Sequence, residues 1–381
     1  MSSSRSLHPK TAAPEGTAQS QGEPSAHANS SDLALDVRDL HCHLGSGKNK
    51  KEILKGITLS IPRGKVLAVL GANGAGKTTL INALSTLIPI SGGSATINGH
   101  DVTSDPAGVR ASISLTGQYA AVDNMLTGHE NLTFFGTLAG LSTREAKARA
   151  TELLTRFGLE RAADSRVADY SGGMRRRLDI ASSLTVQPPL LFLDEPTTGL
   201  DPASRNDVWD MVHHLQADGT SILLTTQYLD EADHLADRIV VLGGGRVLDE
   251  GSSAELKSRY GSSAVTVTFR APELAEHFAE IATDNGFTAA RENTIVRLDA
   301  PDGHRSLVRA LSLWDGSEDD ITDAALIPPT LEDVYMAVAD SGDVARTDAR
   351  EDKASVDSAA APASARSDAR SDAHTPGGGH Q

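Results

Sequence analysis

Short apolar runs alternate with helical patterns of apolar and polar positions through the middle of the chain. The apolar runs predict buried strands at Val66–Leu70, Leu190–Leu193, Ser221–Thr225 and Ile239–Leu242. Segments with helical spacing lie around and between them, at 78–87, 202–216 and 228–236. Such alternation is typical of a largely parallel sheet with helices on its faces. The pattern therefore predicts an α/β domain over residues 31–260, with an antiparallel edge formed by the strands before Pro62.

A second, smaller pattern follows this first domain. Predicted strands and helices alternate at 264–270, 272–285 and 294–298, with a further helix from about Gly303. Two prolines precede a last helix, Thr330–Ala339, with Thr330 as its N-cap and Asp333 at position N3. These elements predict an accessory α+β domain over 261–340.

The two ends of the chain have a different composition. Residues 1–30 and 341–381 are rich in small and polar residues and poor in large apolar side chains. Because such segments bury too little apolar surface to offset the entropy of ordering, both are predicted to be disordered tails.

The charge and the aromatic content of the chain narrow the range of its partners. The formal net charge is -16 and only 4% of the residues are aromatic. Nucleic acids select basic faces and aromatic stacking surfaces, so this composition predicts no nucleic-acid partner. Cys42 is the only cysteine, which excludes an internal disulfide and favours a reducing compartment. No stretch approaches the roughly 20 apolar residues that span a bilayer, so a role at a membrane would need spans from another chain.

A glycine-rich loop lies between the first predicted buried strand and the helix after it. The loop fits the pattern GxxxxGK[ST] and consists of Gly71, Ala72, Asn73, Gly74, Ala75, Gly76, Lys77 and Thr78. Its backbone N–H groups and the following helix N-terminus are expected to surround a β-phosphate. Lys77 would reach the β- and γ-phosphates, Thr78 would hold Mg²⁺, and Thr79 would donate to the α-phosphate. The loop predicts a nucleoside triphosphatase.

Two acidic residues end the predicted strand 190–193. In a parallel sheet, ligands bind beyond the carboxyl ends of the strands, so Asp194 and Glu195 are expected beside the nucleotide. Asp194 would act on Mg²⁺ through water. Glu195 would polarise the attacking water as a general base.

A third motif identifies the family. Ser171, Gly172 and Gly173 open a predicted helix, Met174–Val186, and the segment resembles the LSGGQ-type signature of ATP-binding-cassette (ABC) ATPases. The resemblance covers about residues 33–256. It implies a P-loop fold with a helical subdomain, ATP and Mg²⁺ as cofactors, and hydrolysis of ATP. It also implies a head-to-tail homodimer, in which each signature binds the γ-phosphate held by the other protomer's phosphate loop.

Other family positions can be carried over in the same way. Gln118 matches the Q-loop glutamine, which contacts Mg²⁺ and senses the transmembrane partner. Asp201 matches the D-loop aspartate, which reaches across the dimer. Residues from about 124 to 170 match the helical subdomain that docks on a permease.

Two positions depart from the family pattern. Gln227 stands where most ABC ATPases have the switch histidine. An amide can donate a hydrogen bond to the γ-phosphate but cannot take up a proton or a positive charge, so we expect Gln227 to act as a neutral sensor and Glu195 to remain the base. The region that commonly supplies an aromatic residue to stack on adenine contains none, and either His43 or Leu44 would contact the base. Loose discrimination between ATP and GTP is expected.

Four segments resemble the daunorubicin-resistance ATPase family. They are 118–123, 126–128, 226–233 and the PTLEDVY segment at 329–335. Proteins of that family share the glutamine at the switch position. The resemblance implies an exporter of a drug or lipid-like compound, working through a separate ABC-2-type permease. The ATPase would then lie at the cytoplasmic face of the membrane and touch it only through the permease.

Two other functions stay open at this point. One is an ATPase subunit of another ABC system, such as polysaccharide export or import. The other is a soluble ABC protein acting on ribosomes or DNA, which the single cassette and the negative charge disfavour. The accessory domain could serve docking between protomers or regulation. The substrate contacts the permease, so this sequence does not define the transported compound.

Overall fold

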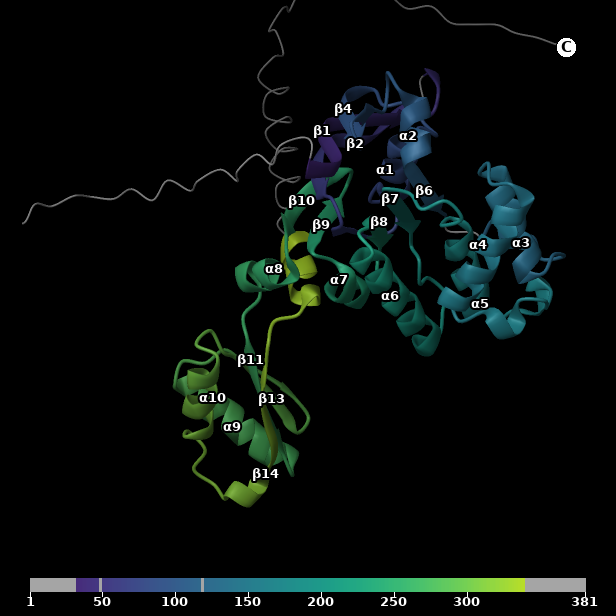
Figure 1. The fold of residues 1–381 in the computed structure, drawn as a ribbon. Coiled ribbons are helices and arrows are strands. Elements are labelled where there is room, and N and C mark those ends of the chain that lie inside the picture. Colours follow the sequence, from purple (N-terminus) through teal and green to yellow (C-terminus); the bar gives the residue numbers. More distant parts are fainter. Residues whose placement is uncertain (1–31, 48–49, 118–119, 340–381) are drawn as a thin grey trace, which may run out of the picture.

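The structure is a computed structural model that describes residues 32–47, 50–117 and 120–339. The predicted tails, 1–30 and 341–381, lie outside the described residues, and so does Gln118. Three sheets organise the described part, two in the first domain and one in the accessory region (Figure 1).

The strands before Pro62 pair antiparallel, as predicted, but they belong to a sheet of their own. Its order is β2-β1-β4-β5, with β1 at Leu33–Leu44, β2 at Lys51–Pro62, β4 at Gly92–Ile97 and β5 at His100–Asp101. All its pairings are antiparallel. The sheet packs through the apolar side chains of β1 and β2 on the same core as helix α1, Lys77–Leu84.

The predicted parallel sheet has six strands in the order β10-β9-β3-β8-β7-β6. The strands are β3 Val66–Leu70, β6 Ile113–Thr116, β7 Leu190–Asp194, β8 Ser221–Thr226, β9 Arg238–Gly243 and β10 Arg246–Gly251. All neighbours pair parallel except β9 and β10, which form an antiparallel edge. Every residue of β3, β7 and β8 is buried, because helices cover one face of the sheet and α1 with the antiparallel sheet covers the other. The predicted α/β fold is therefore confirmed.

The helices of the first domain fall into two groups. Those on the sheets are α1, α2 Pro106–Ser112, α6 Pro202–Ala217, α7 Leu229–Leu235 and α8 Ser253–Tyr260. The helical subdomain contains α3 Gly128–Leu138, α4 Thr143–Arg156, α5 Gly172–Ser182 and the short 3-10 turns Glu160–Ala162 and Val167–Asp169 (Figure 1). Capping boxes at Thr127 and Ser142 start α3 and α4. The signature helix begins two residues earlier than predicted, because Ser171 is its N-cap.

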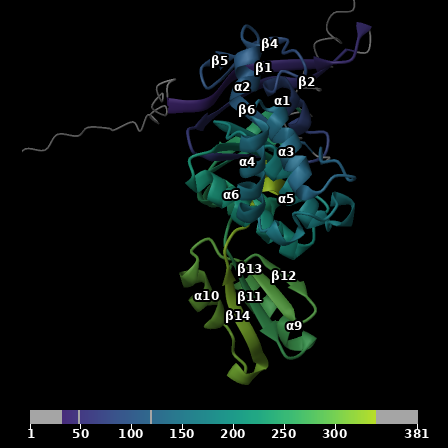
Figure 2. The same cartoon turned by 45° about the vertical axis from the view of Figure 1, so that its right-hand side comes forward.

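The accessory region has the strand order β12-β13-β11-β14, with antiparallel neighbours throughout. Its elements are β11 Ala264–Phe269, α9 Pro272–Asp284, β12 Ala289–Glu292, β13 Ile295–Asp299, α10 His304–Leu311, the 3-10 turn Glu318–Asp320 and β14 Ile321–Ile327. This βαββαβ sequence and strand order make a ferredoxin-like split βαβ unit. Its own core contains Phe269 and Phe278. Figure 2 shows the strands of this unit with helices α9 and α10. Strands β12 and β14 were not predicted.

The last helix returns to the first domain. It covers residues 331–339 and begins at Thr330, whose Oγ1 accepts the N–H of Asp333 at 3.2 Å, as the predicted N-cap. Leu331, Val334 and Val338 are buried in the core that contains β3, β7 and β8, not in the accessory core. The accessory unit is therefore connected to the first domain at both of its ends, through the segment before β11 and through the last helix. The boundaries 261–340 of the accessory domain remain a prediction. The packing of this last helix indicates that the domain ends earlier, after β14.

Candidate nucleotide site

The glycine-rich loop follows the buried strand β3 and bends sharply before α1. The Gly71 N–H donates to the Thr226 carbonyl on β8 at 3.2 Å, and a Cβ on Gly71 would lie 2.5 Å from the Leu242 carbonyl oxygen. Gly74 and Gly76 have φ values of +81° and +114°, which favour glycine. These constraints explain glycine at three positions of the loop, which ends at the N-terminus of α1.

Lys77 crosses the loop and is only 4% exposed. Its Nζ donates to the carbonyl oxygens of Gly71 and Ala72 at 2.7 and 3.3 Å, and lies 3.2 Å from Glu195 Oε1. The Lys77 ammonium thus connects the phosphate loop with the acidic end of strand β7, the two parts predicted for the site. Thr78 is exposed and Thr79 half-buried in the first turn of α1.

The two acids at the end of β7 have different surroundings. Asp194 is buried, and its Oδ1 accepts a hydrogen bond from Thr225 Oγ1 at 2.5 Å. Glu195 has a left-handed backbone, with φ at +48°, a conformation that costs energy for a residue with a side chain. Its N–H donates to the Thr225 carbonyl at 3.1 Å, and its Oε2 accepts from Thr198 Oγ1 at 3.3 Å. Strain of this kind is found at functional sites more than elsewhere.

The signature residues and the D-loop form a second group. Ser171 Oγ accepts the Met174 N–H at 3.2 Å and so caps α5. A Cβ on Gly173 would lie 2.2 Å from Ser204 Oγ, so α5 packs closely on the start of α6. Asp201 caps α6 by accepting from the N–H and the hydroxyl of Ser204 at 3.0 and 2.7 Å. These two hydrogen bonds hold the pKa of Asp201 below its usual value.

Gln227 follows the last residue of β8. Its neighbour Thr226 accepts the Gly71 N–H, so the switch residue lies next to a backbone contact of the phosphate loop. Thr226 Oγ1 also accepts the N–H of Tyr228 at 2.9 Å, which fixes the turn from β8 into α7. The structure therefore brings Gln227 to the same edge of the sheet as Lys77 and Glu195.

Comparison with known proteins decides the family. The sequence model of the family described as "ABC transporter" matches residues 54–198. The daunorubicin/doxorubicin resistance ATP-binding protein DrrA of Streptomyces peucetius is 49% identical over 76% of this chain and 88% of its own length. The chain belongs to the ABC transporter family. The doxorubicin resistance ATP-binding protein DrrA of Mycobacterium tuberculosis is 46% identical over 77% of this chain and 90% of its own length.

A solved structure supports the same assignment. It is described as the ATP-binding subunit of an ABC transporter, is 32% identical, and superposes with a TM-score of 0.53 over 60% of this chain and 93% of that one. The family recognised from the sequence is confirmed. This ABC protein is the ATP-binding and ATP-hydrolysing subunit of a transporter. Membership in the family implies dimerisation and a transmembrane partner subunit. Among the described helices of this ABC subunit, none combines the length and apolar character needed to cross a membrane.

Arg176 is a buried site residue of this ABC subunit that sequence reasoning missed. Its guanidinium donates to the carbonyl oxygens of Pro196, Gly117 and Asp194, at 2.8, 2.7 and 3.2 Å. It thereby ties the signature helix to the strand end at Asp194 and to the residue before Gln118. The available signal was a charged pair three residues apart within the signature helix, Arg176 and Asp179, whose charged atoms lie 3.3 Å apart.

Asp179 continues this connection. Its Oδ1 accepts the N–H of Ala121 at 2.7 Å, beyond the segment that holds Gln118. Burial raises the pKa of Asp179, and the Ala121 N–H and the Arg176 guanidinium oppose that shift. Both ends of the Q-loop are therefore attached to α5.

The two candidates for adenine contact differ in their surroundings. His43 Nδ1 lies 2.7 Å from Ser91 Oγ and so is engaged with the segment before β4. Leu44, the last residue of β1, is 39% exposed. Cys42, two residues earlier, is buried in the core beneath α1, together with Leu54, whose side chain would lie 3.0 Å from a Cβ on Gly76. The strand pairing is irregular between Cys42 and His43, and Leu44 beyond it is exposed to solvent.

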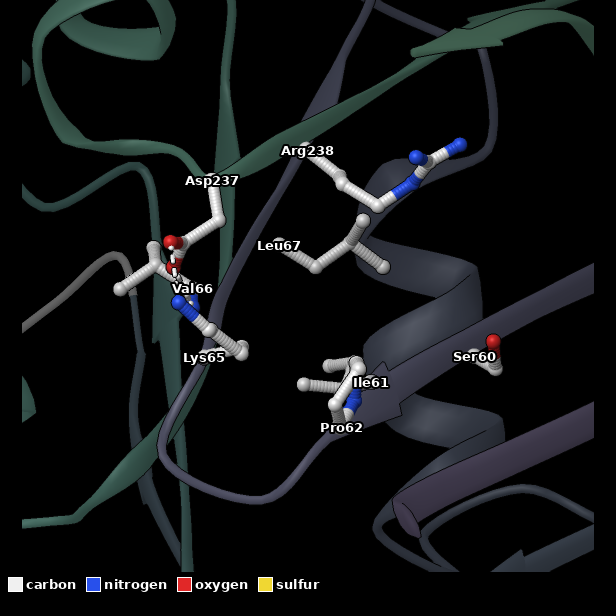
Figure 3. Close-up of a pocket in the computed structure, with 8 residues that line it drawn as sticks. All are labelled: Ser60, Ile61, Pro62, Lys65, Val66, Leu67, Asp237 and Arg238. Atoms are coloured by element: carbon white, nitrogen blue, oxygen red, sulfur yellow. Dashed lines mark hydrogen bonds and ion pairs between the residues drawn. The ribbon is translucent and has the colours of Figure 1, made fainter. Parts of the chain in front are cut away.

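A cavity of about 290 Å³ lies at the opposite end of β3 from the phosphate loop. Its lining is Ser60, Ile61, Pro62, Lys65, Val66, Leu67, Asp237 and Arg238 (Figure 3). Asp237 binds Lys65 Nζ at 2.9 Å and the Val66 N–H at 2.8 Å. None of the residues predicted for the nucleotide lines this cavity, so it is separate from the nucleotide site.

Proposed function

We propose that this ABC subunit powers the export of a drug or lipid-like compound through a separate ABC-2-type permease. The observation that carries the ATPase chemistry is the 3.2 Å approach of Lys77 Nζ to Glu195 Oε1 across the phosphate loop. Export is supported by the resistance proteins that resemble the chain over nearly their whole length. The alternatives, another ABC system or a soluble protein on ribosomes or DNA, lack support of this kind.

The catalytic roles follow from the contacts around Lys77. The phosphates of ATP would replace Glu195 as the partner of the Lys77 ammonium, because a polyphosphate is the stronger anionic partner. The released carboxylate of Glu195 could then accept a proton from the attacking water. Gln227 would donate a hydrogen bond to the γ-phosphate and report its presence. Backbone N–H groups of the loop would hold the β-phosphate.

The residues near the phosphates also suit Mg²⁺. A threonine hydroxyl and a carboxylate are the oxygen ligands that this ion prefers, and Thr78 and Asp194 supply them, with Gln118 as a further ligand. Mg²⁺ bound there would neutralise charge on the phosphates. Asp194 is already oriented by the Thr225 hydroxyl, which leaves its second oxygen for the ion or its water.

The group formed by the signature residues and the D-loop supports the proposal of a dimer. Ser204 of α6 lies against Gly173 of α5 and binds Asp201, and Ser171 caps α5 just before Gly173. We assign this group to the γ-phosphate held by the phosphate loop of a second copy. The ATPase site would then be complete only in a head-to-tail homodimer.

The helical subdomain offers a surface for the permease. Phe134 and Leu138 lie one turn apart on α3 and are 55% and 72% exposed, and Met125 just before α3 is also exposed. Large exposed apolar side chains gathered on one element favour a protein interface. The subunit would thus touch the membrane only through its permease, at the cytoplasmic face.

The test is co-expression with the permease encoded by a neighbouring reading frame. We expect the two chains to co-purify and a subset of anthracycline or lipid-like compounds to stimulate ATP hydrolysis. Phe134→Asp should abolish co-purification, whereas Val308→Asp, at a more exposed apolar position on α10, should not. Absence of co-purification of the unaltered chain, or equal behaviour of the two variants, would refute the assignment.

Leu44 is the residue we assign to adenine. Leu44→Tyr is expected to tighten ATP binding by about fivefold to tenfold, since aromatic stacking on a base contributes roughly 1–3 kcal/mol. It should also increase the preference for ATP over GTP. Equilibrium binding of both nucleotides measures the effect. His43→Tyr is the matched control, because His43 is engaged with Ser91; tighter binding by that variant instead would reverse the assignment.

A further inference from the structure

A buried carboxyl group lies directly behind the switch residue. Glu231, in the first turn of α7, is fully buried, and its nearest polar neighbours are Thr226 of β8, Thr197 and Trp209. Within the described residues, neither carboxyl oxygen of Glu231 has a partner in full hydrogen-bond geometry, and the same holds for Thr197 Oγ1 and Trp209 Nε1. The Glu231 carboxyl and the polar atoms of Thr197, Trp209 and Thr226 therefore lie close together and away from solvent.

These neighbours belong to three parts of the ATPase site. Thr197 lies in the turn between Glu195 and the D-loop, Trp209 lies on α6 beyond Asp201, and Thr226 immediately precedes Gln227. Glu231 is thus the point where the D-loop segment and the switch segment meet.

A second contact joins the same two segments at the surface. Arg205, four residues after Asp201 on α6, donates to Asp230 Oδ2 at 2.8 Å. Its guanidinium also lies over the ring of Tyr228, 5.0 Å from the centroid. The start of α6 and the start of α7 are therefore attached to each other on both the exposed and the buried side.

Packing alone does not account for glutamate at this position. A buried carboxyl without complete hydrogen bonds is costly, and apolar residues of similar volume are often neutral or stabilising in its place. Hydrogen bonds to the Glu231 carboxyl that form in another state of the site would offset the cost of burying it. Small movements of Thr197 and Trp209 towards Glu231 would complete them.

We propose that Glu231 is a positioning residue that links Thr197 and Trp209 to the switch strand, so that Asp201 and Gln227 move as one unit when ATP binds. The inference rests on the roles proposed above for Asp201 and Gln227. Glu231 does not touch the nucleotide in this arrangement. It acts through the two segments that do.

The surroundings of Glu231 shift its pKa. Burial raises its pKa, the nearby Asp230 carboxylate adds to the rise, and Thr226, Thr197 and Trp209 oppose it. Arg176 on α5 is a charged group of opposite sign near it. Glutamine keeps the shape of the Glu231 side chain and can both donate and accept hydrogen bonds, so it is the conservative replacement.

Steady-state ATP hydrolysis by Glu231→Leu and Glu231→Gln tests the proposal. Glu231→Leu should lower kcat by about tenfold, with KM for ATP within about twofold, because misplaced catalytic groups cost rate while the phosphate loop is untouched. Glu231→Gln should retain at least about half of the parental kcat. Thr197→Val should lower kcat in the parent but add little to Glu231→Leu, since both remove one linkage.

Thermal stability separates positioning from a purely structural role. The leucine variant should be as stable as the parent or more so, and yet slower. Since the folded pKa of Glu231 is raised, its contribution to stability is present at low pH and is lost as pH rises through that value. Glu231→Gln should therefore gain in melting temperature relative to the parent as pH rises.

Unchanged kcat in Glu231→Leu would overturn the proposal, and so would a loss of rate that only follows a loss of folded protein. Gln227→Ala and Asp201→Ala are assayed in parallel. If they hydrolyse ATP at the parental rate, the roles proposed for Gln227 and Asp201 have failed. If they are slow and Glu231→Leu is not, the linkage alone has failed.

Discussion

Glu195→Gln should bind ATP but hydrolyse it about 10²–10⁴-fold more slowly, the range expected for loss of a general base. Glutamine preserves the shape of the side chain and can still accept from Thr198, yet it cannot take a proton from water. ATP then stays at the site, and the closed dimer should accumulate. Single-turnover hydrolysis and size-exclusion chromatography with ATP measure the two effects.

The matched control for this prediction is Glu152→Gln, an exposed glutamate on α4 that pairs with Arg149. It should hydrolyse ATP at the parental rate and show no trapped dimer. Parental turnover in Glu195→Gln would remove Glu195 from the role of base. Slow turnover without a stable dimer would leave the base assigned but contradict the composite site.

Lys77→Ala is expected to weaken ATP binding by about 100-fold or more, because it removes a buried charge from its phosphate partner. The structure adds an effect on the free protein. Lys77 is almost fully buried and is the cation beside Glu195, so its removal leaves that carboxylate without the charge that compensates it. The variant should lose roughly 1–3 kcal/mol of folding free energy.

Urea denaturation and nucleotide titration of two further variants sharpen this prediction. Lys77→Ala combined with Glu195→Gln should recover stability without recovering ATP affinity, since the unpaired charge is gone but the phosphate ligand is not restored. Lys65→Ala, at the opposite end of β3, should leave ATP affinity unchanged. Stability lost equally by the single and the double variant would show that Lys77 and Glu195 do not interact in the free protein.

The ion pair between Lys77 and Glu195 also bears on the role proposed for Glu195. As the proposed base, Glu195 would not be free to activate water while the ammonium holds it. A phosphate that attracts Lys77 would release it. Binding of the substrate and activation of the base would therefore be one event, controlled by a single ion pair.

The sequence by itself determined that this is an ATP-hydrolysing ABC subunit and predicted its site residues, because both depend on local motifs. The loop at 71–78, the acids 194 and 195 and the signature at 171–173 each lie within a few residues of a strand or helix end. Apolar runs and caps are local signals too, so the α/β fold and the N-cap at Thr330 could also be predicted. The predicted ends of α1 and α5 were less accurate, since tertiary contacts decide where a helix stops.

Only the tertiary structure decided which distant segments meet. No local pattern shows that the helix at 331–339 packs in the first core, because its apolar face would suit either core. The strand order of the accessory unit depends on pairings between residues far apart in sequence. The same holds for Arg176, whose carbonyl partners come from two distant segments, and for Glu231, whose neighbours come from the D-loop and switch segments. Burial of a charged residue is a property of the assembled layers, and residue spacing along one helix does not encode it.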